Sequence, residues 1–403
     1  MQIKKSEKLL NVRYDIRGRI SDEADRLEKK GIQIIRLNTG NPAAFGMEVP
    51  SSVTDSLTEF AGMSAPYSMS KGLPKAREAI TRYCASKGIT GVEADDIFTG
   101  NGVSELIQMA LQALLNHGDE ILIPTPDYPL WTAAAILAGG NVVHYMCDEQ
   151  ADWYPDIDDI KRKITPRTRA IVIINPNNPT GAVYPKELLN RIIELAREHE
   201  LVIFSDEIYD RLIMDDVEHN SIAALAPDLF TVIFNGLSKS HQICGYRAGW
   251  MVLCGDKSCA GGYIEGVNTL ATLRLCSNVT GQSVISAALD DKTSTRANII
   301  PGGRLFEQRE YAFNALCTIP GISAVKPRAA LYIFPKIDTE MYGITDDEKF
   351  VLDFLREKHV LLTHGGSYNW KLPDHFRLVY LPQMEELVEV MDRLREFLES
   401  YHQ

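Results

Sequence analysis

Short runs of consecutive apolar residues alternate with amphipathic stretches between residues 71 and 254. The short runs are rich in β-branched residues, which is typical of strands buried on both faces. In the longer stretches apolar residues recur every three or four positions, which is typical of helices with one buried face. This alternation predicts an α/β fold with a mostly parallel sheet. We expect strands near 96–102, 120–129, 169–181, 201–209, 231–240 and 250–253, and helices near 71–88, 104–118, 131–140 and 185–200.

The pattern changes after about residue 293. Long amphipathic helices then mix with short alternating strands, which predicts a smaller α+β domain. A helix predicted over residues 17–30 has no place in the large sheet, so we expect it to pack with this second domain. The length of 403 residues also favours two packed units. We expect a large domain at 41–293 and a small domain at 1–40 and 294–403. The helices of the small domain are expected at 302–321, 349–359 and 384–403, and its strands at 322–327, 330–337 and 376–381.

Composition and charge narrow the class of protein. The formal net charge is −12, and no basic stripe with interleaved aromatics is present, so we expect no nucleic-acid partner. The apolar runs are too short to span a membrane, and the first residues lack the apolar core of a signal peptide. The seven cysteines include no CxxC pair, which is typical of reduced thiols in a cytoplasmic protein. We therefore expect a cytoplasmic protein with no membrane association and no metal site.

Polar side chains follow several of the predicted strands at the point where each strand ends. Ligands of open parallel sheets bind beyond the carboxyl ends of the strands, so these side chains are candidates for one site. Taken singly, each has an ordinary alternative as a helix cap, a turn residue or a surface side chain. In chain order they are Ser104, Tyr128, Asn178, Asp206, Tyr209, Lys239 and Arg247.

Taken together, these side chains match the needs of an electron-sink pyridine cofactor. Lys239 supplies an amine for covalent attachment, and Asp206 supplies an anion beside the ring nitrogen. Such a cofactor also needs donors to its ring oxygen, an aromatic stack, and a helix N-terminus with an arginine for its phosphate. Asn178 and Tyr209 supply the donors to the ring oxygen, and Tyr128 supplies the aromatic stack. Ser104 and Arg247 supply the phosphate site.

Longer motifs carry a family resemblance that covers nearly the whole chain. The chain resembles the class I/II aminotransferases of fold type I, which use pyridoxal 5'-phosphate. Within that family, YDIRGRI, GNGVSEL, PDYPLWTA and NWKLPDHFR are most similar to bacterial alanine (glutamate–pyruvate) transaminases. The resemblance implies a mostly parallel, seven-stranded sheet in a large domain and a smaller α+β domain. The motifs that carry it are TGNP at 39–42, APYSMSKG at 65–72, NPNNPTG at 175–181, SDEIY at 205–209, GLSKSHQICGYRAGW at 236–250 and FRLVYL at 376–381.

The resemblance also implies roles for individual residues. Lys239 would move a proton between the substrate and the cofactor, assisted by Asp206 and Tyr209. Tyr67 would reach the phosphate of the partner subunit, which implies a homodimer with shared active sites. The cofactor would be bound by Val103, Ser104, Tyr128, Asn178, Asp206, Tyr209, Ser238, Lys239, Arg247 and Tyr67. The substrate α-carboxylate would be bound by Gly40, Asn178 and Arg377.

The implied reaction moves an amino group between L-alanine and 2-oxoglutarate, an amino acid and a 2-oxo acid, by a ping-pong mechanism. We expect Tyr14 and Arg17 to close over the pocket, where Arg17 would meet the distal carboxylate of glutamate. The alternative is that Arg17 is an ordinary exposed arginine beside a helix start. The segment Ser240–Gln242 departs from the common family pattern, which bears on cofactor affinity and substrate preference.

Other functions fit the same motifs. One alternative is an aminotransferase of aromatic or broad specificity, and another is a pyridoxal-phosphate-dependent carbon–sulfur lyase. A cofactor-binding regulator without catalysis is a third, but such regulators usually carry a basic DNA-binding domain, for which this acidic chain leaves no room.

Overall fold

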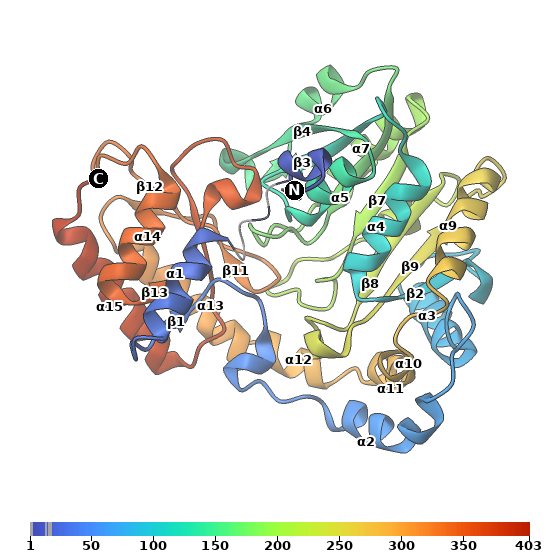
Figure 1. Cartoon of the computed structure of the whole chain (residues 1–403), viewed down its shortest axis with the longest axis horizontal. Coiled ribbons are helices and arrows are strands. Elements are labelled where there is room, and N and C mark those ends of the chain that lie inside the picture. The colour runs from blue at the N-terminus through green and yellow to red at the C-terminus, as the bar shows by residue number, and fades with distance from the viewer. Residues whose placement is uncertain (1–2, 13, 15–17) are drawn as a thin grey trace.

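The computed structural model describes residues 3–12, 14 and 18–403. An eight-stranded sheet forms the centre of the larger part of the molecule, in the order β2-β9-β8-β7-β6-β3-β4-β5 (Figure 1). The strands are β2 (Ile97–Asn101), β3 (Glu120–Thr125), β4 (Asn141–Asp148), β5 (Tyr154–Pro155), β6 (Thr168–Ile174), β7 (Val202–Asp206), β8 (Thr231–Gly236) and β9 (Ala248–Cys254).

The sheet is mostly parallel. Strands β4, β3, β6, β7 and β8 run parallel to their neighbours in that series. Strand β9 is antiparallel to β8 and β2, and β5 is antiparallel to β4. The predicted α/β fold with a mostly parallel sheet is therefore confirmed. The sheet has one strand more than the expected seven. Its strands β4 and β5 lie outside the strand ranges expected from the pattern, because β5 is only two residues long and the sequence of β4, NVVHYMCD, contains no long apolar run.

Successive side chains of each strand point to opposite faces of the sheet, which produces two separate apolar layers. Ile97 and Leu122 lie in one layer, and their neighbours Phe98 and Ile123 lie in the other. The first layer is completed by side chains of α2, α3, α7 and α11, and the second by side chains of α4, α5 and α9. Because both faces are covered, the carboxyl edge of the parallel strands is left as the place for polar groups.

The helices predicted near 71–88, 104–118, 131–140 and 185–200 are confirmed as α3, α4, α5 and α7 within a few residues. The other helices of this larger part were not predicted, and all of its helices follow in chain order. They are α2 (Ser51–Phe60), α3 (Pro74–Ser86), α4 (Val103–Leu114), α5 (Leu130–Leu137), α6 (Ile157–Lys163), α7 (Lys186–Glu198), α8 (Ile222–Leu225), α9 (Gly261–Leu273), α10 (Val279–Ser283) and α11 (Ile285–Asp290). Short 3-10 turns lie between them, at η3 (Pro42–Phe45), η4 (Gly62–Ser64), η5 (Ala94–Asp96), η6 (Glu149–Ala151) and η7 (Cys244–Tyr246).

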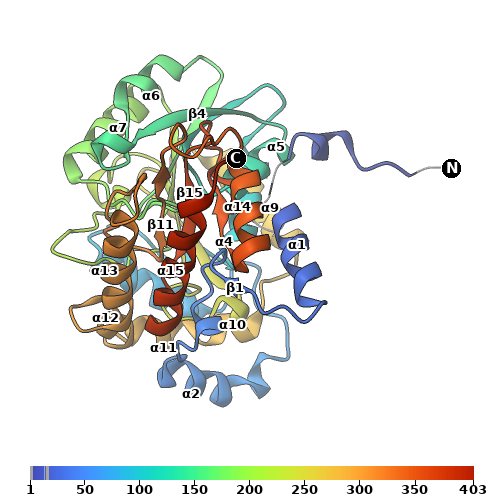
Figure 2. The ribbon, with the colours of Figure 1, turned by 90° about the vertical axis from the view of Figure 1, so that its left-hand side faces the viewer.

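A second, smaller part contains the C-terminal residues and a third apolar cluster (Figures 1 and 2). Helix α1 contacts α14, and β1 pairs in parallel with β13, so residues 19–36 pack against the C-terminal chain. The domain limits proposed from the sequence, 41–293 against 1–40 and 294–403, stay a prediction. The elements are α1 (Arg19–Glu28), β1 (Ile35–Arg36), α12 (Ser294–Ile299), α13 (Arg304–Cys317), β10 (Ile322–Ser323), β11 (Tyr332–Ile333), β12 (Lys336–Ile337), α14 (Asp347–Lys358), β13 (Val360–Leu361), β14 (Thr363–His364), η8 (Gly365–Tyr368), β15 (Phe376–Val379) and α15 (Met384–Ser400).

The prediction of a single strand over residues 330–337 is wrong in one respect. It is divided into β11 and β12 by Phe334 and Pro335, and the two halves pair with different strands, β15 and β10. Proline has no N–H to donate to a sheet ladder, so the chain changes partners at that point. In the described part of the chain, no helix is both long and apolar enough to span a membrane.

Candidate active site

A cavity of about 560 Å³ lies at the carboxyl edge of the parallel strands. Its walls come from the ends of β6, β7 and β8, the start of α4, and residues of the smaller part. Most of the side chains singled out from the sequence meet there. Those that line it are Tyr14, Gly40, Val103, Ser104, Tyr128, Asn178, Asp206, Tyr209, Ser238, Lys239, Arg247 and Arg377.

Lys239 lies three residues beyond the end of β8, at the floor of the cavity. Its Nζ donates a hydrogen bond to the carbonyl oxygen of Gly40 at 2.5 Å and lies 3.9 Å from Sγ of Cys244. Within the described residues, no carboxylate forms a salt bridge with this ammonium. Lys239 is thus held only by neutral partners, so its side chain remains available to a ligand.

Asp206 is the last residue of β7 and is buried. Its Oδ2 accepts a hydrogen bond from Nε1 of Trp131 at 3.1 Å, and its Oδ1 accepts one from the backbone N–H of Ile208 at 3.3 Å. Burial raises the pKa of Asp206 to about 6, although both hydrogen bonds and the charge of Lys239 oppose the rise. A carboxylate in this setting is stabilised by any cation that a ligand brings into the cavity.

Two pairs of tyrosine hydroxyls border the cavity. The hydroxyls of Tyr209 and Tyr332 are 2.9 Å apart, and those of Tyr14 and Tyr128 are 3.1 Å apart. Burial raises the pKa of Tyr209 and of Tyr128 well above the ordinary value, and the neighbouring hydroxyl in each pair adds to the rise. The hydroxyls of Tyr209 and Tyr128 are therefore neutral and able to donate hydrogen bonds over the physiological pH range.

One end of the cavity is suited to an anion. Helix α4 begins at Val103, and the N–H groups of its first turn have no partners within the helix. Arg247 faces the same end from a left-handed backbone conformation with φ 55°. Its guanidinium donates to the carbonyl oxygens of Cys244 at 2.9 Å and Asn101 at 3.2 Å. A Cβ on Gly102 would lie 2.2 Å from Nη2 of Arg247, so only glycine leaves room for the guanidinium.

A second cationic position lies on the opposite wall, at Arg377 in β15. The side chain is buried, with its guanidinium 4.2 Å from the ring centre of Tyr332 and 4.7 Å from that of Tyr368. It donates to Oδ1 of Asn178 at 2.9 Å and to the carbonyl oxygen of Asn38. Its Nε has no partner, and no carboxylate forms a salt bridge with it among the described residues. A buried guanidinium with only neutral partners is suited to bind a carboxylate.

One predicted site residue does not line this cavity, and another is not described by the structure. Tyr67 is 79% exposed and is absent from the cavity wall. Arg17 lies outside the described residues. The structure also brings in residues that the sequence did not single out: Asn38, Trp131, Tyr332, Tyr368 and Cys244. Trp131 and Cys244 stand within the quoted motifs PDYPLWTA and GLSKSHQICGYRAGW, which was the available signal for them.

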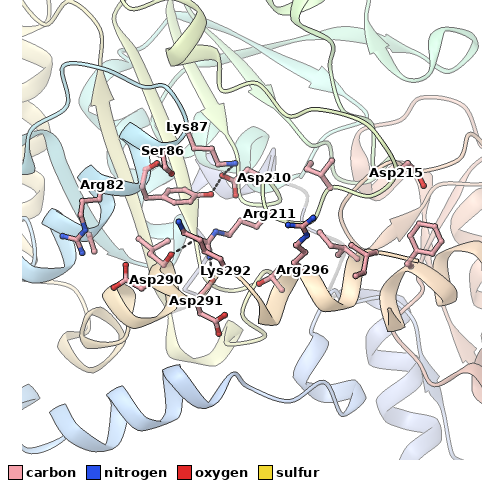
Figure 3. A pocket seen from close by; sticks show the side chains of 18 of the residues that line it. Arg82, Ser86, Lys87, Asp210, Arg211, Asp215, Asp290, Asp291, Lys292 and Arg296 are labelled. Carbon is pink, nitrogen blue, oxygen red and sulfur yellow. Dashed lines mark hydrogen bonds and ion pairs between the residues drawn. The ribbon is translucent and has the colours of Figure 1, made fainter. Parts of the chain in front are cut away.

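A larger cavity, of about 960 Å³, lies between the end of α3, residues 210–216 and the α11–α12 connection (Figure 3). Asp210 dominates its floor, where it accepts a hydrogen bond from Tyr83 at 2.5 Å and pairs with Lys87 at 3.2 Å. Its lining contains as many positively charged arginines and lysines as negatively charged aspartates. None of the predicted site residues is among them, so cavity size alone does not locate the chemistry.

Comparison with known proteins places the chain among characterised relatives. The model of the family "Aminotransferase class I and II" matches residues 32–394. The glutamate-pyruvate aminotransferase AlaA of Escherichia coli K12 is 55% identical over 401 residues, which cover 100% of this chain and 99% of that protein. An alanine aminotransferase of Mycobacterium tuberculosis H37Rv is 50% identical over 399 residues, covering 99% of this chain and 93% of that protein. The crystal structure of an aminotransferase from Escherichia coli superposes over 100% of both chains with a TM-score of 0.99 and 55% identity.

Proposed function

This chain belongs to the class I and II aminotransferases, and from that premise we propose that it exchanges an amino group between L-alanine and 2-oxoglutarate. The products are pyruvate and L-glutamate. The observation that carries the proposal is the 55% identity, over the full length of both chains, with a protein named glutamate-pyruvate aminotransferase. The chemical character of the cavity agrees with this reaction, because it offers one free amine and one buried guanidinium on facing walls.

We propose pyridoxal 5'-phosphate as the cofactor, because the residues of the cavity fit its functional groups. The anion end formed by Val103 and Arg247 suits the phosphate, and the absence of a Cβ at Gly102 keeps that end open. The buried carboxyl of Asp206 suits a protonated ring nitrogen, since its raised pKa falls when a cation is placed beside it. Ser104 and Ser238 would add hydrogen bonds to the phosphate, Asn178 and Tyr209 to the ring oxygen, and Tyr128 a stacked ring.

When bound, pyridoxal 5'-phosphate supplies an aldehyde for covalent attachment and a ring that takes up electrons from the substrate α-carbon. The protein must hold the substrate and move protons. Arg377 would bind the α-carboxylate with Asn178 and Gly40 beside it, as its planar fork and lack of an acidic partner allow. Lys239, whose Nζ is bonded only to neutral groups, would take the proton from the α-carbon and return it on the other side of the C–N bond.

Selection of substrate is proposed to involve the N-terminal segment. Tyr14 already reaches the cavity, with its hydroxyl 3.1 Å from that of Tyr128. Arg17 lies outside the described residues, and its contact with the distal carboxylate of glutamate remains a proposal from the sequence. An Arg17→Ala variant is expected to lose activity with glutamate more than with alanine; equal losses with both substrates would reject the contact.

We also propose that the active enzyme is a homodimer. Several apolar side chains are exposed on the single chain, and the N-terminal residues with η1 (Glu7–Leu10) project from its body (Figure 2). Subunit interfaces commonly cover exposed apolar side chains of this kind. Tyr67 belongs to this exposed set and would then reach the phosphate in the partner's site. The set comprises Ile3, Leu10, Met63, Tyr67, Met69, Leu273 and Leu275.

A steady-state assay tests the proposed function. The purified protein with pyridoxal 5'-phosphate is given L-alanine and 2-oxoglutarate, and both pyruvate and glutamate are measured. Ping-pong kinetics are expected, with activity lost in Lys239→Ala and retained in Lys292→Ala, which changes an exposed lysine outside the cavity. Continuous pyruvate formation without an oxo acid from a cystathionine-like substrate, which carries a sulfur leaving group, would instead indicate a lyase. Activity with aromatic amino acids only would indicate another specificity.

A further inference from the structure

His375 is a buried histidine that takes no part in the cavity. It stands immediately before β15, two residues ahead of Arg377, and its side chain is 0% exposed. Side chains two residues apart along an extended chain point to the same face. His375 and Arg377 therefore occupy adjacent positions on one face, with His375 one layer farther from the candidate active site.

Charged groups from both parts of the molecule surround His375. Its Nδ1 lies 2.7 Å from Oδ1 of Asp374, and its Nε2 lies 3.5 Å from Oε1 of Glu149. Lys336 in β12 completes the cluster, 3.2 Å from Glu149 and 3.6 Å from Asp374. Glu149 belongs to η6, directly after β4 of the eight-stranded sheet. The other three residues belong to the smaller part, so this cluster joins the two parts of the molecule.

Aromatic rings exclude water from the imidazole. Phe334 is stacked on it with ring centres 4.8 Å apart and an interplanar angle of 23°. Trp153 and Trp370 meet it edge-on at 5.3 Å and 5.2 Å. A buried charge is tolerated only when it is paired, and an unpaired one is costly. The cluster is therefore stable only while each charged side chain in it keeps a partner of opposite charge.

The same rings connect the cluster with Arg377. Phe334, stacked on His375, meets the ring of Tyr368 edge-on at 5.9 Å. Tyr368 in turn lies beneath the guanidinium of Arg377 at 4.7 Å. A shift of His375 is thus passed to Arg377 along the backbone of β15 and across two rings.

We propose that protonated His375 is a positioning residue for Arg377, and that its bridge to Glu149 docks β15 on the eight-stranded sheet so that the guanidinium meets the substrate carboxylate. The assignment of the carboxylate to Arg377 rests on the proposed function. Neither Glu149 nor His375 lines the cavity, so both act through Arg377.

The pKa values of the cluster give the direction of the pH effect. Burial alone would lower the pKa of His375, but the carboxylates of Asp374 and Glu149 outweigh it and raise this pKa above 6.5. The pKa of Glu149 is lowered, because His375 and Lys336 outweigh the opposing effect of burial. The imidazolium therefore persists to higher pH than that of an ordinary histidine, and it is lost as the pH rises through the raised pKa. Carboxylate binding should weaken over the same alkaline range.

The test measures binding of propionate, which is alanine without its amino group, to the cofactor-loaded protein by calorimetry between about pH 6 and pH 9. Propionate needs the carboxylate site but cannot be transaminated. His375→Gln removes the positive charge of the imidazolium. Glu149→Gln removes the negative charge that faces it from the larger part of the molecule. Glu120→Gln is the matched control, because it removes a similarly buried carboxylate, which pairs with the exposed Arg167 at the first residue of β3.

For the wild type and Glu120→Gln, we expect the Kd of propionate to rise on the alkaline side. In Glu149→Gln the rise should move to lower pH by roughly one unit, because the histidine loses a stabilising charge. In His375→Gln binding should be weaker by roughly tenfold and independent of pH. The KM for alanine should follow the Kd, while kcat changes less.

The same pH dependence in all four proteins would overturn the proposal, as would a loss of thermal stability without a change in the Kd profile. If His375→Gln does not fold, the pH profile of propionate binding to Glu149→Gln tests the proposal by itself. Failure of the proposed function is a different result, since the wild type would then bind propionate with the expected pH profile but would not transaminate.

Discussion

Asp206 combines two properties that conflict in the protein without its cofactor. It lies at the end of a strand where burial favours the neutral acid, whereas its proposed role as the partner of a ring nitrogen requires the anion. Trp131 and the N–H of Ile208 bond the carboxyl group but do not neutralise it. The conflict is resolved when a cation occupies the cavity, so the cost of the buried carboxylate can be measured in its absence.

For the cofactor-free protein, the stability difference between the wild type and Asp206→Asn should depend on pH. The folded pKa of Asp206 is about 6 and the ordinary value is 3.8, so the folded state keeps a proton that the unfolded state has lost. The contribution of Asp206 is present below pH 3.8 and is lost as the pH rises through about 6. The wild type should therefore lose at most about 3 kcal/mol relative to the variant between these pH values. Denaturant titrations at a series of pH values measure this, and a pH-independent difference would contradict the assignment.

The candidate site was predictable because its residues stand at strand ends. Lys239, Asp206 and Asn178 each follow an apolar run, and the parallel topology brings such ends to one edge. Tyr332 and Tyr368 were not predictable, because they reach Arg377 by packing between segments far apart in the sequence. Tyr67 is proposed to reach the phosphate in the site of a second subunit, so its role depends on a contact between two chains.

At the scale of elements, the start of α4 determines whether an anion can be held. Gly102 precedes the helix with φ 74°, a conformation that favours glycine, and its missing Cβ leaves room for Arg247. Periodicity was enough to predict the strands β2, β3, β6, β7, β8 and β9 and the helices α3, α4, α5 and α7. It did not predict β4 and β5. The strands β10 and β12 lie within the predicted ranges 322–327 and 330–337 but are much shorter, since pairing with distant residues rather than local sequence sets their limits.

Gly102→Ala should weaken cofactor binding by at least about tenfold, because the new methyl group displaces the guanidinium of Arg247 as well as straining the backbone. Gly91→Ala is the matched control. Gly91 also has a positive φ, 68°, but nothing lies within 4 Å of its Cβ position. Both variants should lose similar stability, and only Gly102→Ala should lose affinity in a fluorescence titration with pyridoxal 5'-phosphate. Equal affinities of the two variants would exclude the anion end from cofactor binding.

At the scale of the whole molecule, shared sites make a complementation experiment possible. Lys239→Ala and Tyr67→Ala homodimers should each be impaired, because every site in them carries one change. A mixed dimer has one site with Lys239 from one subunit and Tyr67 from the other, which is complete. After subunit exchange, activity should recover to about a quarter of the wild type, since half of the dimers are mixed and each has one intact site. No recovery, or a monomer in light scattering, would contradict the shared site.

We propose that the protein holds the amino group of one substrate on its cofactor before it passes the group to another. The most direct measurement mixes the cofactor-loaded protein with L-alanine alone and follows the visible absorbance of the cofactor together with released pyruvate. The account predicts that the aldehyde form disappears, that pyruvate appears in an amount equal to the sites, and that 2-oxoglutarate restores the spectrum. An unchanged spectrum with both L-alanine and L-glutamate, or continuous pyruvate release without any oxo acid, would contradict it.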